Sequence, residues 1–107
     1  MSYDIWLEVD AGGPEPLQVG ASWNYTSNGA RLWEAAGLDL AAAAGRTAVS
    51  VAADLDAALI VLRADAARFE ALNPPNGWGS YATLLPALDT LRAICRAAPY
   101  ALVRVWR

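Results

Sequence analysis

The two ends of this 107-residue chain alternate between apolar and polar side chains, which is the pattern of a half-buried β-strand. Residues 3–10 place Tyr3, Ile5, Leu7 and Val9 on one face. Residues 101–106 repeat the alternation up to Trp106. Strands at both ends restrict the chain to folds in which distant segments meet in one sheet.

A weaker alternation over residues 18–26 predicts a second strand. It follows a Gly- and Pro-rich stretch at 11–16 that has the composition of a loop. The alternation predicts that four side chains share one face of this strand: Val19, Ala21, Trp23 and Tyr25. The spacing predicts a hairpin with the first strand.

The middle of the chain repeats its apolar residues at helical spacing. A helix is predicted from Thr47 to about Ala64, and Asp65 can cap a further turn or two through Leu72. Its apolar face is made of four residues: Val51, Leu55, Leu59 and Leu62. Two helices, or one helix with a break, therefore occupy residues 47–72.

The last helix is predicted to begin after Ser80 and to end before Pro99. Pro86 would remove one backbone hydrogen bond and bend this helix, unless the helix starts later. A short helix is expected over about 30–36, capped by Asn28 and ended by Gly37. Residues 38–45 favour helix through their alanines but are short, so helix and loop both stay open.

The order β-β-α-α-α-β predicts a single α+β domain over residues 1–107. We expect a three-stranded, mainly antiparallel sheet with about three helices on one face. The two terminal strands should lie side by side. In that case Glu8 and Arg104 pair across them, and Trp6 and Trp106 share a face.

The residues that the chain lacks exclude whole classes of chemistry. It has no histidine, so it has neither the usual general base nor the commonest metal ligand. Cys95 is the only cysteine and falls on an apolar helix face, where we expect a buried and inert thiol. Asp54 and Asp56 face different directions on their helix, so they form no catalytic pair. We expect no cofactor, no metal and no enzymatic activity.

The charge and the apolar runs limit the partners. The net charge is −3, and neither half of the chain carries the dense basic patch that a nucleic-acid-binding surface needs. The apolar stretches are too short for a membrane span, and Asp4 and Glu8 interrupt any signal-peptide pattern. A soluble, cytoplasmic protein is expected, in the host cytoplasm if a phage encodes it.

The segment from Asn73 to Tyr81 has an excess of residues with special roles. As a turn it is well explained, since Asn73 can leave the helix in a left-handed conformation and Asn76-Gly77 allows positive φ. A turn does not require Trp78 between two glycines. Its ring can stack on a ligand, fill a pocket of a partner protein or fold back over the core.

A second cluster, Asn24-Tyr-Thr-Ser-Asn28, joins a strand to a helix. Its side chains serve as local caps, or Asn24 and Thr26 line a polar pocket. If the Asn73–Tyr81 loop folds back onto this junction, the candidate ligand- or partner-binding residues are six: Trp78, Tyr81, Asn76, Asn24, Asn28 and Thr26. In the small-ligand version, Trp78 and Tyr81 stack on a nucleotide- or sugar-like molecule.

These motifs resemble a family of small, functionally uncharacterised proteins of actinobacteria and their phages. The resemblance rests on an N-x-T-x-N segment at Asn24–Asn28 and an NPPNGWG-x-Y segment at Asn73–Tyr81. Asp4–Glu8, Ala36-Gly37, Cys95, Pro99 and Val103 also fit, whereas Leu32 stands where the family often has methionine. The resemblance implies one domain and a phage or bacterial origin, with no activity, substrate or cofactor attached.

Three functional hypotheses follow. The first is a small non-enzymatic interaction protein, such as a phage accessory protein that modulates a host component and works as a homo-oligomer or with a protein partner. The second is a small-ligand-binding protein with the Trp- and Asn-lined pocket. The third is an enzyme with unusual machinery, which would need a carboxylate of raised pKa in a cleft.

Overall fold

The computed structural model describes all 107 residues and confirms the α+β class. The strands are β1 (Ser2–Val9), β2 (Leu17–Thr26) and β3 (Leu102–Trp106). The α-helices are α1 (Ala30–Ala35), α2 (Ala48–Ala64), α3 (Ala66–Glu70) and α4 (Tyr81–Ala97), with short 3-10 turns η1 (Ser27–Gly29) and η2 (Ala41–Ala43). Asp65 divides α2 from α3, as predicted, and its carboxylate accepts a bond from the Arg68 backbone N–H.

The sheet has the order β2-β1-β3, and both pairs of strands are antiparallel. The two terminal strands are therefore neighbours, as the alternation predicted. Arg104 Nε donates to Glu8 Oε1 at 2.9 Å across them. Trp6 is opposite Arg104 in the register and Asp4 is opposite Trp106, which puts all four side chains on one face of the sheet.

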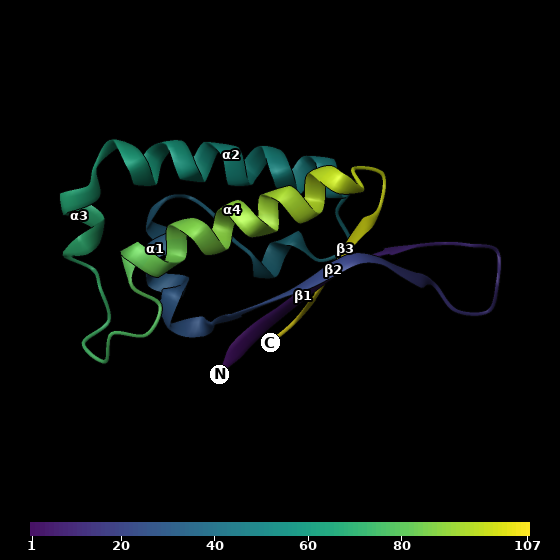
Figure 1. Cartoon of the computed structure of the whole chain (residues 1–107), viewed down its shortest axis with the longest axis horizontal. Coiled ribbons are helices and arrows are strands. Elements are labelled where there is room, and N and C mark those ends of the chain that lie inside the picture. The colour runs from purple at the N-terminus through teal and green to yellow at the C-terminus, as the bar shows by residue number, and fades with distance from the viewer.

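The helices cover the other face of this sheet (Figure 1). α4 packs against β2, and α2 packs against α4 on the side away from the sheet. The core between these layers contains the predicted inward residues of β1 and the apolar stripes of both long helices. One face of the sheet is thus left without a helix.

The β1–β2 hairpin extends as an arm beyond the helices, with the loop at residues 10–16 at its tip (Figure 1). A bulge interrupts it: Ile5 pairs with Trp23 and Leu7 pairs with Val19, so three residues of β2 lie opposite Trp6. Gly20 takes a positive φ there. The prediction that Ala21 shares the inner face was wrong, because the bulge turns it out to solvent.

Two predicted caps were wrong in detail. Asn28 does not cap α1; it lies in η1, where its backbone N–H bonds Thr26 Oγ1. Ser80 does occupy the N-cap position of α4, but its side chain makes no capping bond. Asn73 supplies that bond instead, since its Oδ1 accepts from the Tyr81 backbone N–H at 2.8 Å. Asn73 also has no left-handed conformation, because only glycines take positive φ in this chain.

The ambiguous segment 38–45 is a loop with the single turn η2. It runs beside β3, where Gly45 N–H bonds the Val103 carbonyl and Val103 N–H bonds the Arg46 carbonyl. Pro86 lies inside α4, because this helix begins at Tyr81. None of the helices combines the length and apolar character needed to cross a membrane.

Candidate functional site

The loop between α3 and α4 rests on the junction between β2 and α1. At Gly79 a Cβ would lie 2.6 Å from the backbone nitrogen of Gly29 and 3.0 Å from the carbonyl carbon of Asn28. Contact this close is possible only because residue 79 has no side chain. The structure therefore brings together the two segments that the sequence singled out.

Trp78 projects from this loop into solvent, with 69% of its surface exposed. Its backbone N–H bonds Asn76 Oδ1 at 3.0 Å, a local turn that fixes the loop just before the ring. Asn73 ties the other side of the loop to the start of α4. The ring is thus exposed on a loop whose backbone is held at three points, by Asn76, Asn73 and the Gly79 contact.

Tyr81 lies in the core rather than beside Trp78. Its ring stacks on Phe69, with the centroids 6.5 Å apart, and its hydroxyl donates to the Leu62 carbonyl at 2.6 Å. A ligand stacked between Trp78 and Tyr81 is incompatible with this arrangement. The sequence could not separate a buried tyrosine from an exposed one, because both fit the first turn of an amphipathic helix.

The polar cluster 24–28 divides between two places. Asn24 lies on the helix-free face of the sheet, where its Nδ2 donates to Asp4 Oδ1 at 2.8 Å. The Thr26 hydroxyl caps η1 by accepting a bond from the Asn28 backbone N–H, and Asn28 is exposed beside Gly79. The six candidate residues therefore line no common pocket.

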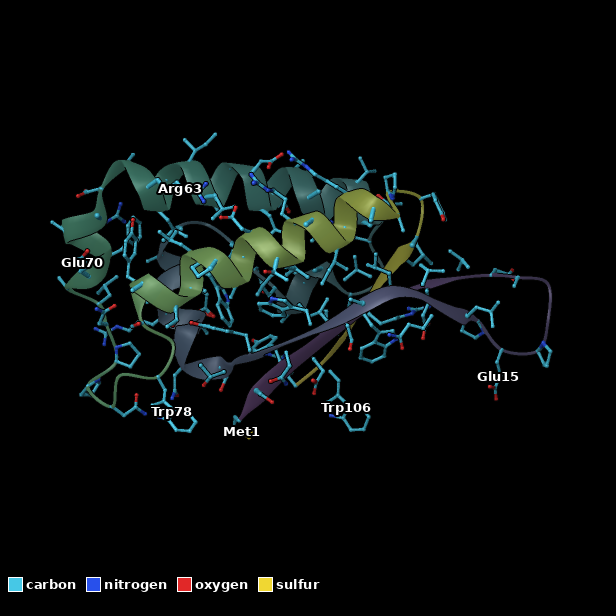
Figure 2. The ribbon with its side chains drawn as sticks, viewed as in Figure 1. Met1, Glu15, Arg63, Glu70, Trp78 and Trp106 are labelled. Carbon is cyan, nitrogen blue, oxygen red and sulfur yellow. The ribbon has the colours of Figure 1, made fainter.

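The helix-free face of the sheet carries a second exposed tryptophan. Trp106, at the end of β3, exposes 70% of its surface. Trp6 is half-buried beside it, and its indole N–H donates to Glu8 Oε2 at 2.9 Å. Figure 2 shows Trp78, Met1 and Trp106 projecting from the same side of the molecule, opposite the side on which α2 lies.

Hydrogen bonds stabilise the ionised form of Glu8 on this face. The indole of Trp6 and then the guanidinium of Arg104 lower the pKa of the Glu8 carboxyl from its usual range. Glu8 therefore remains ionised and bonded at neutral pH.

A second carboxylate with a shifted pKa lies away from this face, at the contact of α2 with α4. Desolvation raises the pKa of Asp56, but its bonds to Arg92 and Arg96 outweigh that effect and lower the pKa overall.

A shallow hollow of about 330 Å³ lies at one end of the sheet, where the two termini meet. It is lined by Met1, Ser2, Tyr3, Ser27 and Arg107. It includes none of the six predicted site residues. No three Cys, Asp or Glu side chains lie close enough together to hold a metal ion.

Cys95 is fully buried in α4, and burial raises the pKa of its thiol to about 11. At pH 8 only a small fraction of the thiol is ionised, and the surrounding core keeps reagents away from it. We therefore expect a thiol reagent to label the native protein at least about 100-fold more slowly than the protein unfolded in guanidinium. Equal rates in the two conditions would contradict the buried position.

The raised thiol pKa also predicts a pH dependence of stability. The folded state keeps the proton above the ordinary pKa of 9.0, so the unfolded state loses it first. The free energy of unfolding should therefore fall as the pH rises from about 9 to about 11. The Cys95→Ala variant, measured by urea unfolding over the same range, should lack this part of the decline.

Sequence reasoning predicted that Trp6 and Trp106 share a face but did not assign that face to a site. The signal was the placement of tryptophan at outward positions of two adjacent strands, where polar side chains are usual. Comparison of the chain with protein-family models, with curated proteins and with solved structures finds no match in any of the three.

Proposed function

We propose that this chain is a non-enzymatic protein-interaction module that binds a partner protein through the helix-free side of its sheet. The observation that carries the proposal is the exposure of Trp78 and Trp106 on that side. Tryptophan is the residue most enriched among interface hot spots, and an exposed ring gains most when a partner pocket covers it. If a phage encodes the protein, the partner is a host component.

Both rings are presented on ordered backbone. Trp106 belongs to a strand paired with β1, and Trp78 follows the Asn76 turn on a loop seated against Gly29. A preorganised surface loses little conformational entropy on binding, so more of the contact energy is available for affinity.

The polar groups beside Trp6 and Trp106 on the helix-free face are already bonded. Glu8 has Arg104 and Trp6 as partners, and Asp4 has Asn24. When a partner covers this face, these groups keep their hydrogen bonds, which reduces the desolvation penalty. Apolar rings surrounded by satisfied polar groups resemble the hot-spot arrangement of protein interfaces.

The two other hypotheses have less support. A small-ligand site made of Trp78, Tyr81 and the asparagines lacks a cavity, because Tyr81 is in the core and the hollow at the termini contains none of them. An enzyme would need a carboxylate whose pKa is raised. The two carboxylates with shifted pKa values, Glu8 and Asp56, are both shifted downward.

Alanine substitution of each exposed tryptophan tests the proposal. Trp78→Ala and Trp106→Ala should each weaken binding of the partner by about 30-fold, the effect of a hot spot worth about 2 kcal/mol. Each should change the free energy of unfolding by no more than about 0.5 kcal/mol, as expected at an exposed site. Tagged protein is used to capture partners from lysate of an actinobacterial host, and the Kd of a purified captured protein is then measured by calorimetry.

Tyr100→Ala is the matched control, since Tyr100 is 71% exposed but lies in the turn between α4 and β3. It should bind the partner as the unsubstituted protein does. Capture that is equally strong with the Trp78→Ala/Trp106→Ala double variant would contradict the proposed surface.

A further inference from the structure

The helix α2 is apolar on the side that faces solvent as well as on the side that faces the core. Ile60 is 71% exposed and Val49 is 57% exposed, and the exposed alanines between and beyond them complete one stripe. The stripe consists of Val49, Ala53, Ala57, Ile60 and Ala64, spaced by four, four, three and four residues, which returns each of them to one face of a helix. A surface helix normally carries polar or charged residues there, and a helix that is apolar all round is normally covered on both sides.

The charged residues of α2 lie beside this stripe and are all paired within the chain. Asp54 pairs with Arg46 at 2.6 Å and Arg63 pairs with Asp89 at 2.6 Å. Asp56 pairs with both Arg92 and Arg96. A partner can therefore cover the outer face of α2 without burying an unpaired charge of this helix. Burial of an unpaired charge would make such a contact strongly unfavourable.

We infer that a second copy of this chain covers the outer face of α2, with the two α2 helices antiparallel across a two-fold axis near Ala57. The sizes of the side chains favour this arrangement. Reversing the helix about that point puts Ile60 opposite Ala53 of the second copy and Val49 opposite Ala64. Each large side chain thus meets a small one, and both contacts occur twice, as an isologous interface requires.

The alanines also set the distance between the helices. Helices with small residues at the contact approach to about 8 Å between their axes, and each larger side chain then fits into the space over an alanine. A parallel pair would instead put Ile60 against Ile60 and leave alanines facing alanines. The pattern therefore favours the antiparallel pair.

The contact between the two α2 helices is small, so we expect a weak dimer. Seventeen residues of helix are about 25 Å long and about 10 Å wide, which is at the low end of interface sizes. The dimer should be reversible, with a Kd on the order of 10–100 µM. Because α2 lies on the side opposite Trp78 and Trp106, the dimer would leave the helix-free face of the sheet and both of these rings uncovered (Figures 1 and 2). The inference does not rest on the proposed function.

Disulfide cross-linking tests the antiparallel register. Ala57→Cys lies at the axis and should form a covalent dimer on mild oxidation. Val49→Cys should not form one with itself, because its two copies would be about 22 Å apart, far beyond the reach of a disulfide. A mixture of Val49→Cys and Ala64→Cys chains should form the mixed dimer. Cys95 does not interfere, because it is buried. Self-cross-linking of Val49→Cys without any of Ala57→Cys would overturn the register.

Sedimentation equilibrium between about 5 and 500 µM tests the dimer itself. We expect reversible dimerisation that Ile60→Glu weakens at least tenfold, whereas Leu17→Glu, at a similarly exposed leucine on the hairpin arm, leaves it unchanged. Ile60→Ala alone should weaken the dimer, and the exchanged pair Ala53→Ile/Ile60→Ala should restore it. A chain that stays monomeric at 500 µM, or a dimer that Ile60→Glu does not affect, would overturn the inference.

Discussion

Trp33→Ala is expected to lower the free energy of unfolding by about 3–5 kcal/mol, the range for removing a large aromatic side chain from a core. Trp33 is 1% exposed. Its ring meets Tyr3 edge to face at 5.1 Å and lies 6.5 Å from Tyr25. Because a chain of this length has a total stability of roughly 5–15 kcal/mol, this one substitution removes a large part of it.

Trp78→Ala is the control, because it deletes the same side chain at an exposed site. Urea unfolding of the two variants, followed by circular dichroism, compares the same chemical change in two environments. A loss below about 1.5 kcal/mol for Trp33→Ala would mean that the aromatic cluster under the β2–α1 junction is not packed as described. Equal losses for the two tryptophans would contradict the assignment of one to the core and the other to the surface.

The arrangement of the sheet was predictable because its signals are local and periodic. Alternation in β1 and β3 identified their inner faces, and the opposite charges of Glu8 and Arg104 were consistent with adjacent terminal strands. The bulge at Gly20 was not predictable in the same way. Two extra residues in β2 take Ala21 off the inner face while Val19 and Trp23 stay opposite inward residues of β1, and only the register of the neighbouring strand shows this.

The caps show a different limit. Asn28 and Ser80 both had a suitable residue type at a suitable position, yet neither side chain caps its helix. The α4 cap comes from Asn73, eight residues away in sequence from the N–H that it accepts. Residue type predicts which side chains are able to cap a helix, whereas the path of the loop decides which of them reaches the free N–H groups at its N-terminus.

The candidate site was predictable only in part, for the same reason. Composition singled out Trp78, and the small-ligand hypothesis required its loop to meet the 24–28 junction. The core position of Tyr81 depends on Phe69 and Leu62, which come from two other helices. The apolar outer stripe of α2 gives no separate signal in the sequence, because the inner stripe alone accounts for the helical spacing. A second stripe becomes informative only when the first is known to face the core.

Gly79→Ala is expected to lower the free energy of unfolding by about 2–5 kcal/mol. Part of this loss, about 1–2 kcal/mol, comes from placing an L side chain at a φ of +77°. The rest, about 1–3 kcal/mol, comes from the overlap of the new methyl group with Gly29 and Asn28. All three of its nearest atoms are backbone atoms, so no side chain can rotate away to make room.

Gly77→Ala separates these two contributions, because Gly77 has nearly the same φ, +76°, and nothing within 4 Å of the added methyl. It should lower stability by about 1–2 kcal/mol only. The difference between the two variants, measured by urea unfolding, is the free energy of seating the loop on the β2–α1 junction. If the two losses were equal, the loop would not rest on that junction, and Trp78 would not be held in place for a partner. A larger loss for Gly79→Ala, together with weaker binding of the partner by that variant alone, would show that one backbone contact stabilises the fold and positions the ring.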